Sequence, residues 1–157
     1  MPKPQPFVVT PKDSHPLHVG GENITVLANA ESTGSVELFL EEGPEGAGPP
    51  PHFHAWDEAY YVLEGAVDVL MGDRMQTVGQ GELVFVPGGT LHTFRIKTAR
   101  ARFLGFTSRA GASAFFRDID HEVGDTLDVG KMIQIANRHA IQVAPPPPLP
   151  DGGVLAR

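Results

Sequence analysis

Residues 46–65 read GAGPPPHFHAWDEAYYVLEG, and this stretch decides the fold. His52, His54 and Glu58 are separated by even numbers of residues. Because side chains alternate between the two faces of a strand, all three can point to one side if the intervening turn preserves this parity. Two imidazoles and a carboxylate in a dry interior are costly unless a cation joins them. The stretch therefore predicts an inward-facing metal site.

A second stretch, residues 81–96, reads GELVFVPGGTLHTFRI. It predicts a strand, a Pro-Gly turn at residues 87–89, and a further strand that carries His92 inward. The hairpin between the two stretches is long enough to bring His92 beside the first three side chains. Three histidines and one carboxylate suit one divalent transition metal: Fe, Mn, Ni, Co, Cu or Zn.

The chain around these stretches is typical of an all-β domain. Between residues 24 and 106, short β-branched and apolar runs alternate with turn signals such as Gly72-Asp73. Strands at spacings of about 8–12 residues predict a sandwich or a barrel. The 18 glycines and 15 prolines of the chain agree with many turns.

The sequence changes character after residue 106. Apolar residues at helical spacing predict helices over residues 112–119 and 129–139, packed on the barrel. Four prolines at 145–148 predict an extended polyproline II segment. The expected organisation is an N-terminal arm (1–20), a barrel domain (21–108), a C-terminal helical extension (109–144) and a Pro-rich tail (145–157).

Composition excludes several functions. The 157 residues have a formal net charge of −7 and no dense run of Lys and Arg, so neither nucleic acid nor an anionic membrane is an expected partner. Without cysteine there is no disulfide, thiolate ligand or cysteine nucleophile. The N-terminus lacks the apolar stretch of a signal peptide, and no segment approaches the ~20 apolar residues of a membrane span. The expected location is cytoplasmic.

The two stretches resemble the two signature motifs of the cupin superfamily. The first matches G-x5-H-x-H-x3-E-x6-G at every specified position, from Gly46 to Gly65. The second matches G-x5-P-x-G-x2-H from Gly81 to His92, and it departs at Ile96, where the family often has Asn. That Asn is not a metal ligand, so the departure does not affect the predicted metal site.

The resemblance implies an all-β fold, namely a double-stranded β-helix or cupin jelly-roll barrel of six to eight strands, here with a short C-terminal helical extension. It also implies a metal at one end of the barrel lumen and often a homodimer. The wider outline, PPHFH, then DEAYYVLEG, then FVPGGTLHTF, is similar to single-domain cupins of the quercetin-2,3-dioxygenase-like type.

The expected metal ligands are His52, His54, Glu58 and His92. In quercetinase-like cupins the residue that matches Glu58 is implied both as a ligand and as a proton acceptor. Tyr60 shares the parity of Glu58, so it either hydrogen-bonds a substrate oxygen or lines the barrel. The expected catalytic residues are thus Glu58 and Tyr60. The expected substrate pocket consists of Val62, Phe94, Ile96 and Trp56, although Trp56 could instead pack under the Pro-rich loop.

A cupin fold does not by itself determine the reaction. The leading hypothesis is a metal-dependent dioxygenase that acts on a small aromatic or enolic substrate. The alternatives are a redox-neutral isomerase, cyclase or lyase that uses the metal as a Lewis acid, and a non-enzymatic module that binds a small molecule.

Overall fold

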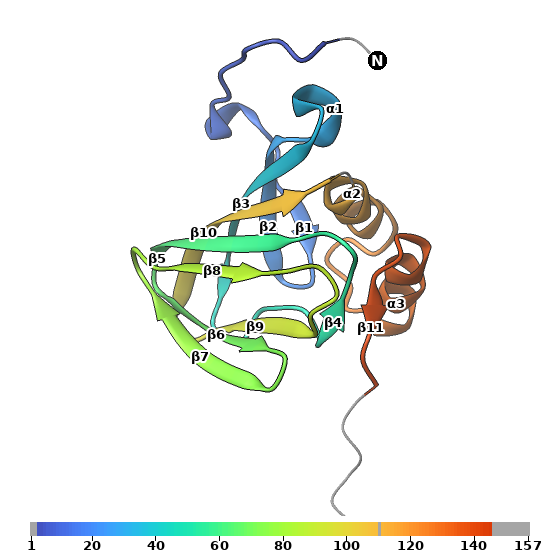
Figure 1. The fold of residues 1–157 in the computed structure, drawn as a ribbon. Coiled ribbons are helices and arrows are strands. Elements are labelled where there is room, and N and C mark those ends of the chain that lie inside the picture. The colour runs from blue at the N-terminus through green and yellow to red at the C-terminus, as the bar shows by residue number, and fades with distance from the viewer. Residues whose placement is uncertain (1–2, 110, 146–157) are drawn as a thin grey trace, which may run out of the picture.

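The computed structural model describes residues 3–109 and 111–145 and shows two antiparallel sheets that face each other as a barrel (Figure 1). The larger sheet has the order β1 (Leu17–Val19), β2 (Glu22–Ala28), β3 (Val36–Pro44), β10 (Arg100–Ser108), β5 (Glu58–Glu64) and β8 (Leu83–Val86). The smaller sheet has the order β11 (Gln142–Val143), β4 (His52–Phe53), β9 (His92–Ile96), β6 (Ala66–Met71) and β7 (Arg74–Gly79). This is the jelly-roll fold that the sequence predicts.

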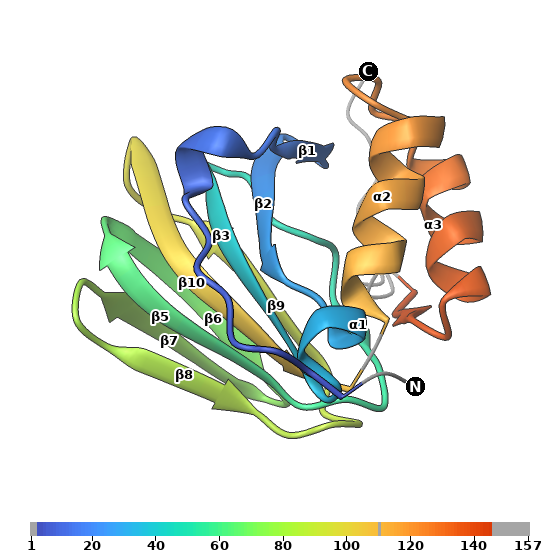
Figure 2. The same ribbon diagram turned by 90° about the horizontal axis from the view of Figure 1, so that it is seen from above.

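The helices lie beside the barrel. Two are short: η1 (Pro11–Asp13) precedes β1, and α1 (Ala30–Thr33) lies between β2 and β3. Two longer ones, α2 (Ala112–Glu122) and α3 (Val129–Arg138), follow β10 and agree with the predicted helical extension. Figure 2 shows α2 and α3 side by side against one side of the barrel.

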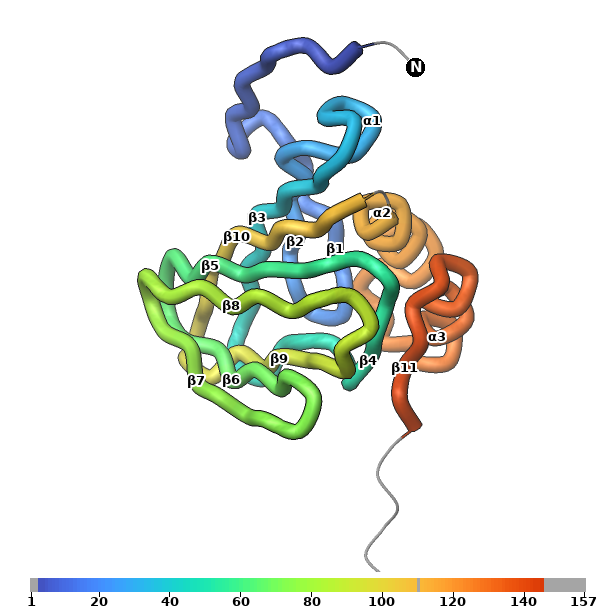
Figure 3. The backbone as a smooth tube through the Cα atoms, in the orientation of Figure 1, coloured from blue at the N-terminus to red at the C-terminus, as the bar shows by residue number. Residues whose placement is uncertain are grey.

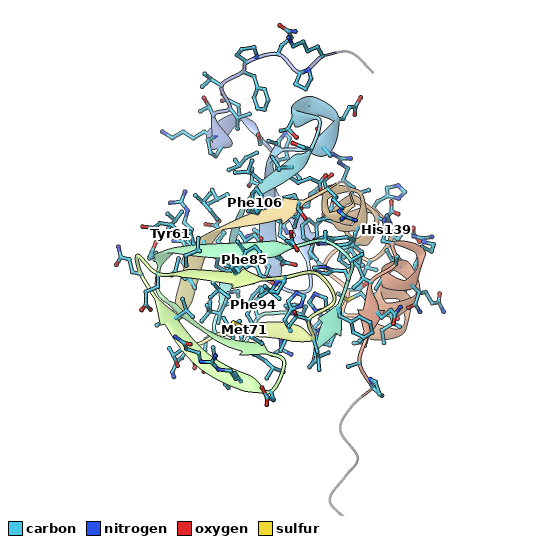
Figure 4. All side chains as sticks on the ribbon, in the orientation of Figure 1. Tyr61, Met71, Phe85, Phe94, Phe106 and His139 are labelled. Atoms are coloured by element: carbon cyan, nitrogen blue, oxygen red, sulfur yellow. The ribbon has the colours of Figure 1, made fainter. Side chains whose placement is uncertain are left out.

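Alternation along the strands fills the barrel with apolar side chains. In β10, Ala101 and Phe103 are buried between more exposed neighbours, as period-2 patterning requires. One buried cluster lies inside the barrel and includes Val62, Phe94 and Ile96. Phe94 packs edge to face on Phe103, and Figure 4 labels it on β9. The inner faces of both sheets thus form one core.

A second buried cluster joins the barrel to the helices. It combines Ile24 and Phe39 from the larger sheet with Ile119 of α2 and Ile135 of α3. Phe39 packs edge to face on Phe116 of α2, with ring centroids 5.1 Å apart. The helices are therefore docked on the barrel through their own apolar interface.

The β6–β7 hairpin is closed by two residues, Gly72 and Asp73, between the paired Met71 and Arg74. Gly72 has φ +64°, a conformation that glycine adopts without steric cost. The backbone tube in Figure 3 shows how this hairpin folds across the lower side of the barrel. The tight turn sets the register in which β6 pairs with β7.

Two details differ from the sequence-based expectation. The glycines and prolines of residues 41–51 predict a loop, but strand β3 runs to Pro44 and therefore includes Glu41. Strand β1 lies within the segment predicted as an arm and pairs with β2. The predicted Pro-rich tail falls outside the described residues beyond Pro145. Within residues 3–109 and 111–145, no helix is long and apolar enough to cross a membrane.

Candidate metal centre

Four side chains converge at one end of the barrel: His52, His54, Glu58 and His92. One potential ligand atom from each lies within 4.8 Å of all the others. Glu58 Oε2 is 2.7 Å from His54 Nε2 and 3.4 Å from His92 Nε2. The structure thus brings together the four residues that the sequence singled out.

Strand pairing explains this convergence. His52 on β4 lies opposite His92 on β9, so their rings approach to a centroid distance of 4.4 Å. These two strands belong to the smaller sheet. Glu58 begins β5 of the larger sheet and pairs there with Thr107 of β10. The centre therefore bridges the two sheets where they come together.

Backbone carbonyls orient all three histidine rings. The Nδ1 atoms of His52, His54 and His92 lie 2.9, 3.0 and 2.8 Å from the carbonyl oxygens of Pro50, Trp56 and Thr90. A carbonyl oxygen only accepts, so Nδ1 carries the proton in each neutral ring. Each Nε2 then presents a lone pair, which is the arrangement found in metal-binding histidines.

The surroundings shift the pKa values of three of these side chains. Burial lowers the pKa of His52 to about 4, helped by the neighbouring His92, so this ring is neutral at pH 7. Burial alone would raise the pKa of Glu58, but the neighbouring His54 and His92 outweigh it and hold that pKa well below its usual range. Burial lowers the pKa of His92, and the contact with Glu58 more than compensates, so the pKa is raised.

These residues fit a divalent metal. With protons on Nδ1, the contact between His54 Nε2 and Glu58 Oε2 sets two lone pairs face to face, and the side chains are only 3% and 15% exposed. A cation between them removes the repulsion. Two ligand atoms each about 2.1 Å from a metal lie about 3.0 Å apart at right angles and about 4.2 Å apart when opposite. The 3.4 Å between Glu58 Oε2 and His92 Nε2 falls in this range, and the 2.7 Å between Glu58 Oε2 and His54 Nε2 lies slightly below it.

Tyr60 supports the carboxylate. Its hydroxyl donates a hydrogen bond to Glu58 Oε1, the oxygen that does not face His54. Burial, and then the charge of Glu58, raises the pKa of Tyr60 well above its usual value, so the phenol keeps its proton. Tyr60 therefore orients Glu58 as well as lining the barrel.

The centre opens onto a cavity of about 240 Å³. That is roughly eight times the ~30 Å³ that one water occupies in the liquid, so a small organic molecule fits. One wall belongs to the barrel and includes Ile24, Phe39 and Phe94. The opposite wall belongs to the helical extension and consists of Ala112, Phe115 and Phe116 of α2 together with Val129, Met132, Ile133 and Ala136 of α3.

Two of the four predicted pocket residues line this cavity. Trp56 lies parallel to the His54 ring, with centroids 4.1 Å apart, and contributes to the wall beside Phe94. Val62 and Ile96 do not line it, because they lie deeper in the packed barrel core. Their inward parity was predicted correctly, but parity does not determine depth along the barrel.

Sequence reasoning missed several lining residues. Two buried carboxylates, Glu22 and Glu41, face the cavity from β2 and β3. The alternation of Glu37, Phe39 and Glu41 was the available signal for an inward Glu41. Nothing in the local sequence of α2 and α3 indicates that they close the cavity, because this depends on how they dock.

Comparison with known proteins agrees with this geometry. Residues 39–105 match the cupin domain family Cupin_2. Over 113 residues, or 71% of this chain, the sequence is 26% identical to quercetin 2,3-dioxygenase of Bacillus subtilis. The match spans only 34% of that longer protein.

Solved structures show the same fold. KdgF from Halomonas sp. superposes with a TM-score of 0.64 at 18% identity, covering 70% of this chain and 99% of that one. At this identity the likeness shows the fold alone. The polyketide cyclase RemF from Streptomyces resistomycificus has a TM-score of 0.59 at 28% identity, over 66% of this chain and 80% of RemF. The family match over residues 39–105, the two facing sheets and these structural relatives agree that the chain has the cupin jelly-roll fold.

Proposed function

We propose that this chain is a metal-dependent enzyme, a dioxygenase that acts on a small aromatic or enolic substrate. The observation that carries the proposal is the set of four convergent ligands at one end of a mostly apolar cavity. The likeness to a quercetin 2,3-dioxygenase supports the reaction class. Fe, Mn, Ni, Co, Cu and Zn all suit the ligand set.

His52, His54, Glu58 and His92 would hold the metal. When bound, such a metal supplies Lewis acidity and lowers the pKa of an oxygen that it coordinates. Glu58 is placed to accept the proton of a substrate hydroxyl, because its carboxylate lies at the cavity wall. Tyr60 holds one carboxylate oxygen of Glu58 and leaves the other free to face the histidines.

The aromatic walls would orient the substrate. The Trp56 ring is fixed against His54, so a flat substrate stacked on it lies beside the ligand set. The helices α2 and α3 cover the cavity and limit the access of water to a reactive intermediate.

Redox-neutral catalysis is the second candidate. The likeness to the polyketide cyclase RemF favours it, since that relative has a slightly higher identity than the dioxygenase. The same ligands and the same Glu58 would then promote isomerisation, cyclisation or elimination without O₂. A module that only binds a small molecule would hold ligand without turnover. A cytoplasmic location and a homodimer stay predictions.

Metal content and O₂ dependence test the proposal. Wild-type protein purified without added metal is analysed for bound elements beside His52→Ala and His92→Ala, with His121→Ala as a control on exposed α2 surface. We expect about one metal per chain, lost in the two ligand variants only. Turnover of enolic compounds that requires O₂ supports the dioxygenase, and turnover without O₂ supports the second candidate. No metal, even after reconstitution with each ion, contradicts both.

A further inference from the structure

Two buried carboxyl groups face the cavity from outside the metal centre. Glu22 on β2 is 6% exposed and Glu41 on β3 is 5% exposed, and both line the cavity that Glu58 also lines. Carboxylates are rarely buried unless they have a partner or a function. Neither belongs to the four ligands, so the proposed function leaves them without a role.

Gly105 makes room for one of them. A Cβ atom at Gly105 would lie 1.9 Å from Glu41 Oε1, so any larger residue on this strand would displace the carboxyl group. Gly105 pairs with Tyr60 in the sheet. The missing side chain thus lets Glu41 lie over β10, on the side of the sheet where Tyr60 and Glu58 stand.

Buried polar atoms without a partner gather at this cavity. Among the described residues, four buried side-chain atoms make no hydrogen bond, and three of them belong to residues of the cavity wall. These three are Glu22 Oε2, Trp56 Nε1 and Thr107 Oγ1. An unpartnered buried polar atom is costly, and a bound ligand with oxygen groups would remove that cost.

Burial favours the protonated form of both carboxyl groups. Burial raises the pKa of Glu22 to about 8, despite the opposing charge of Arg95. Burial and then the nearby Glu22 raise the pKa of Glu41 well above its usual value. A protonated carboxyl group both donates and accepts hydrogen bonds, so it suits a neutral hydroxyl or carbonyl group.

We propose that Glu22 and Glu41 form a second polar subsite, which binds a hydroxyl or carbonyl group of the substrate other than the oxygens that the metal would hold. The substrate is then a small ring compound with chelating oxygens and a further oxygen group. This inference rests on the proposed function, because it names the substrate class of the same cavity.

A matched pair of ligands tests the subsite. Kojic acid and allomaltol share one enolic chelating edge, and they differ only by a hydroxyl group on the opposite side of the ring. Their affinities for the Zn²⁺-loaded protein are measured by calorimetry, since Zn²⁺ does not support redox turnover. We expect kojic acid to bind about five- to tenfold more tightly, the effect of one buried hydrogen bond.

Variants assign the preference to the two carboxyl groups. Glu22→Leu and Glu41→Leu are expected to abolish the preference for kojic acid over allomaltol, whereas Glu22→Gln retains it. Gly105→Ala is expected to weaken it by displacing Glu41. Glu42→Leu is the matched control, because Glu42 lies next to Glu41 on β3 but faces outward, where it contacts Arg100. A preference that survives in both leucine variants overturns the subsite.

Further outcomes separate the subsite from the metal centre. A protein that holds Zn²⁺ but binds both compounds equally, or neither, overturns the subsite and leaves the metal centre intact. Tighter binding of the aminomethyl analogue of kojic acid also overturns it, since it would indicate a site for a cation. If no Zn²⁺ binds, the metal centre fails. Infrared spectra of metal-free protein then decide the subsite. The subsite requires a carboxylic acid band at pH 7 that is weaker in Glu22→Gln and in Glu41→Gln.

Discussion

Glu37 on β3 accepts two hydrogen bonds from Ser113 in the first turn of α2, one from the backbone N–H at 3.1 Å and one from the hydroxyl at 2.5 Å. Both residues are buried. A negative or hydrogen-bonding group at the start of a helix satisfies N–H groups that lack a partner within the helix. Glu37 therefore adds a polar attachment to the apolar interface that holds this wall of the cavity on the barrel.

Replacing Glu37 should loosen this attachment. In Glu37→Ala the donors of Ser113 stay buried without an acceptor, which costs about 1–3 kcal/mol of unfolding free energy. Urea denaturation measures this loss, with Glu42→Ala as the control on the exposed face of the same strand. Equal stability of the two variants would contradict a buried structural role for Glu37.

Tyr60 should affect metal affinity without being a ligand. In Tyr60→Phe, Glu58 loses the hydrogen bond to Oε1 but keeps its contacts with the histidines. Removal of a hydrogen-bonding partner that orients a metal ligand lowers the metal affinity by about 10–100-fold. Competition with a chelator of known affinity measures the change for Zn²⁺ in this variant beside His92→Ala. An affinity as low as that of His92→Ala would indicate that Tyr60 does more than orient Glu58.

The sequence predicts the ligand cluster better than the cavity. Parity within one strand and one turn places His52, His54 and Glu58 on a common face, and a hairpin of defined length adds His92. These are local constraints, which a sequence pattern carries. The depth of Val62 and Ile96 depends instead on barrel curvature and packing, so their placement at the cavity could not be decided from parity.

The helical wall and the buried carboxyl groups depend on long-range packing. The apolar spacing of Phe115, Phe116 and Met132 predicts helices but not the surface on which they dock. Glu41 lies beside Gly43 and Pro44, which favour a loop, and the strand extends through it because β3 pairs there with β2 and, over a longer separation, with β10. The pairing with β10 joins residues about 60 positions apart and leaves no local signature.

Glu22 should make the protein less stable as the pH rises. Its pKa is about 8 in the fold and near 4.5 when solvated, so the folded state binds more protons between these values. The free energy of unfolding therefore falls as the pH rises from 4.5 to about 8. The fall is at most roughly 1.4 kcal/mol for each pH unit.

The variant Glu22→Gln removes this dependence, because an amide does not titrate. Chemical denaturation of metal-free protein at pH 5, 6.5 and 8 measures this dependence. The free energy of unfolding of the variant should increase relative to that of the wild type as the pH increases. Glu31→Gln, on exposed α1, serves as the control and should follow the wild type. Parallel curves for wild type and Glu22→Gln would show that Glu22 does not hold its proton in the fold.

The helical extension should decide which molecules enter the cavity. Ala136 of α3 is 4% exposed and lines the cavity, so Ala136→Leu fills space that a ligand would occupy. Because this side chain is not a metal ligand, Zn²⁺ content should stay at the wild-type level while the affinity for kojic acid falls at least tenfold. Gln134→Leu adds a similar side chain to the exposed face of the same helix and should change neither property. Unchanged kojic acid binding in Ala136→Leu would mean that the ligand reaches the metal without contacting α3, and the cavity wall would then belong to the barrel alone.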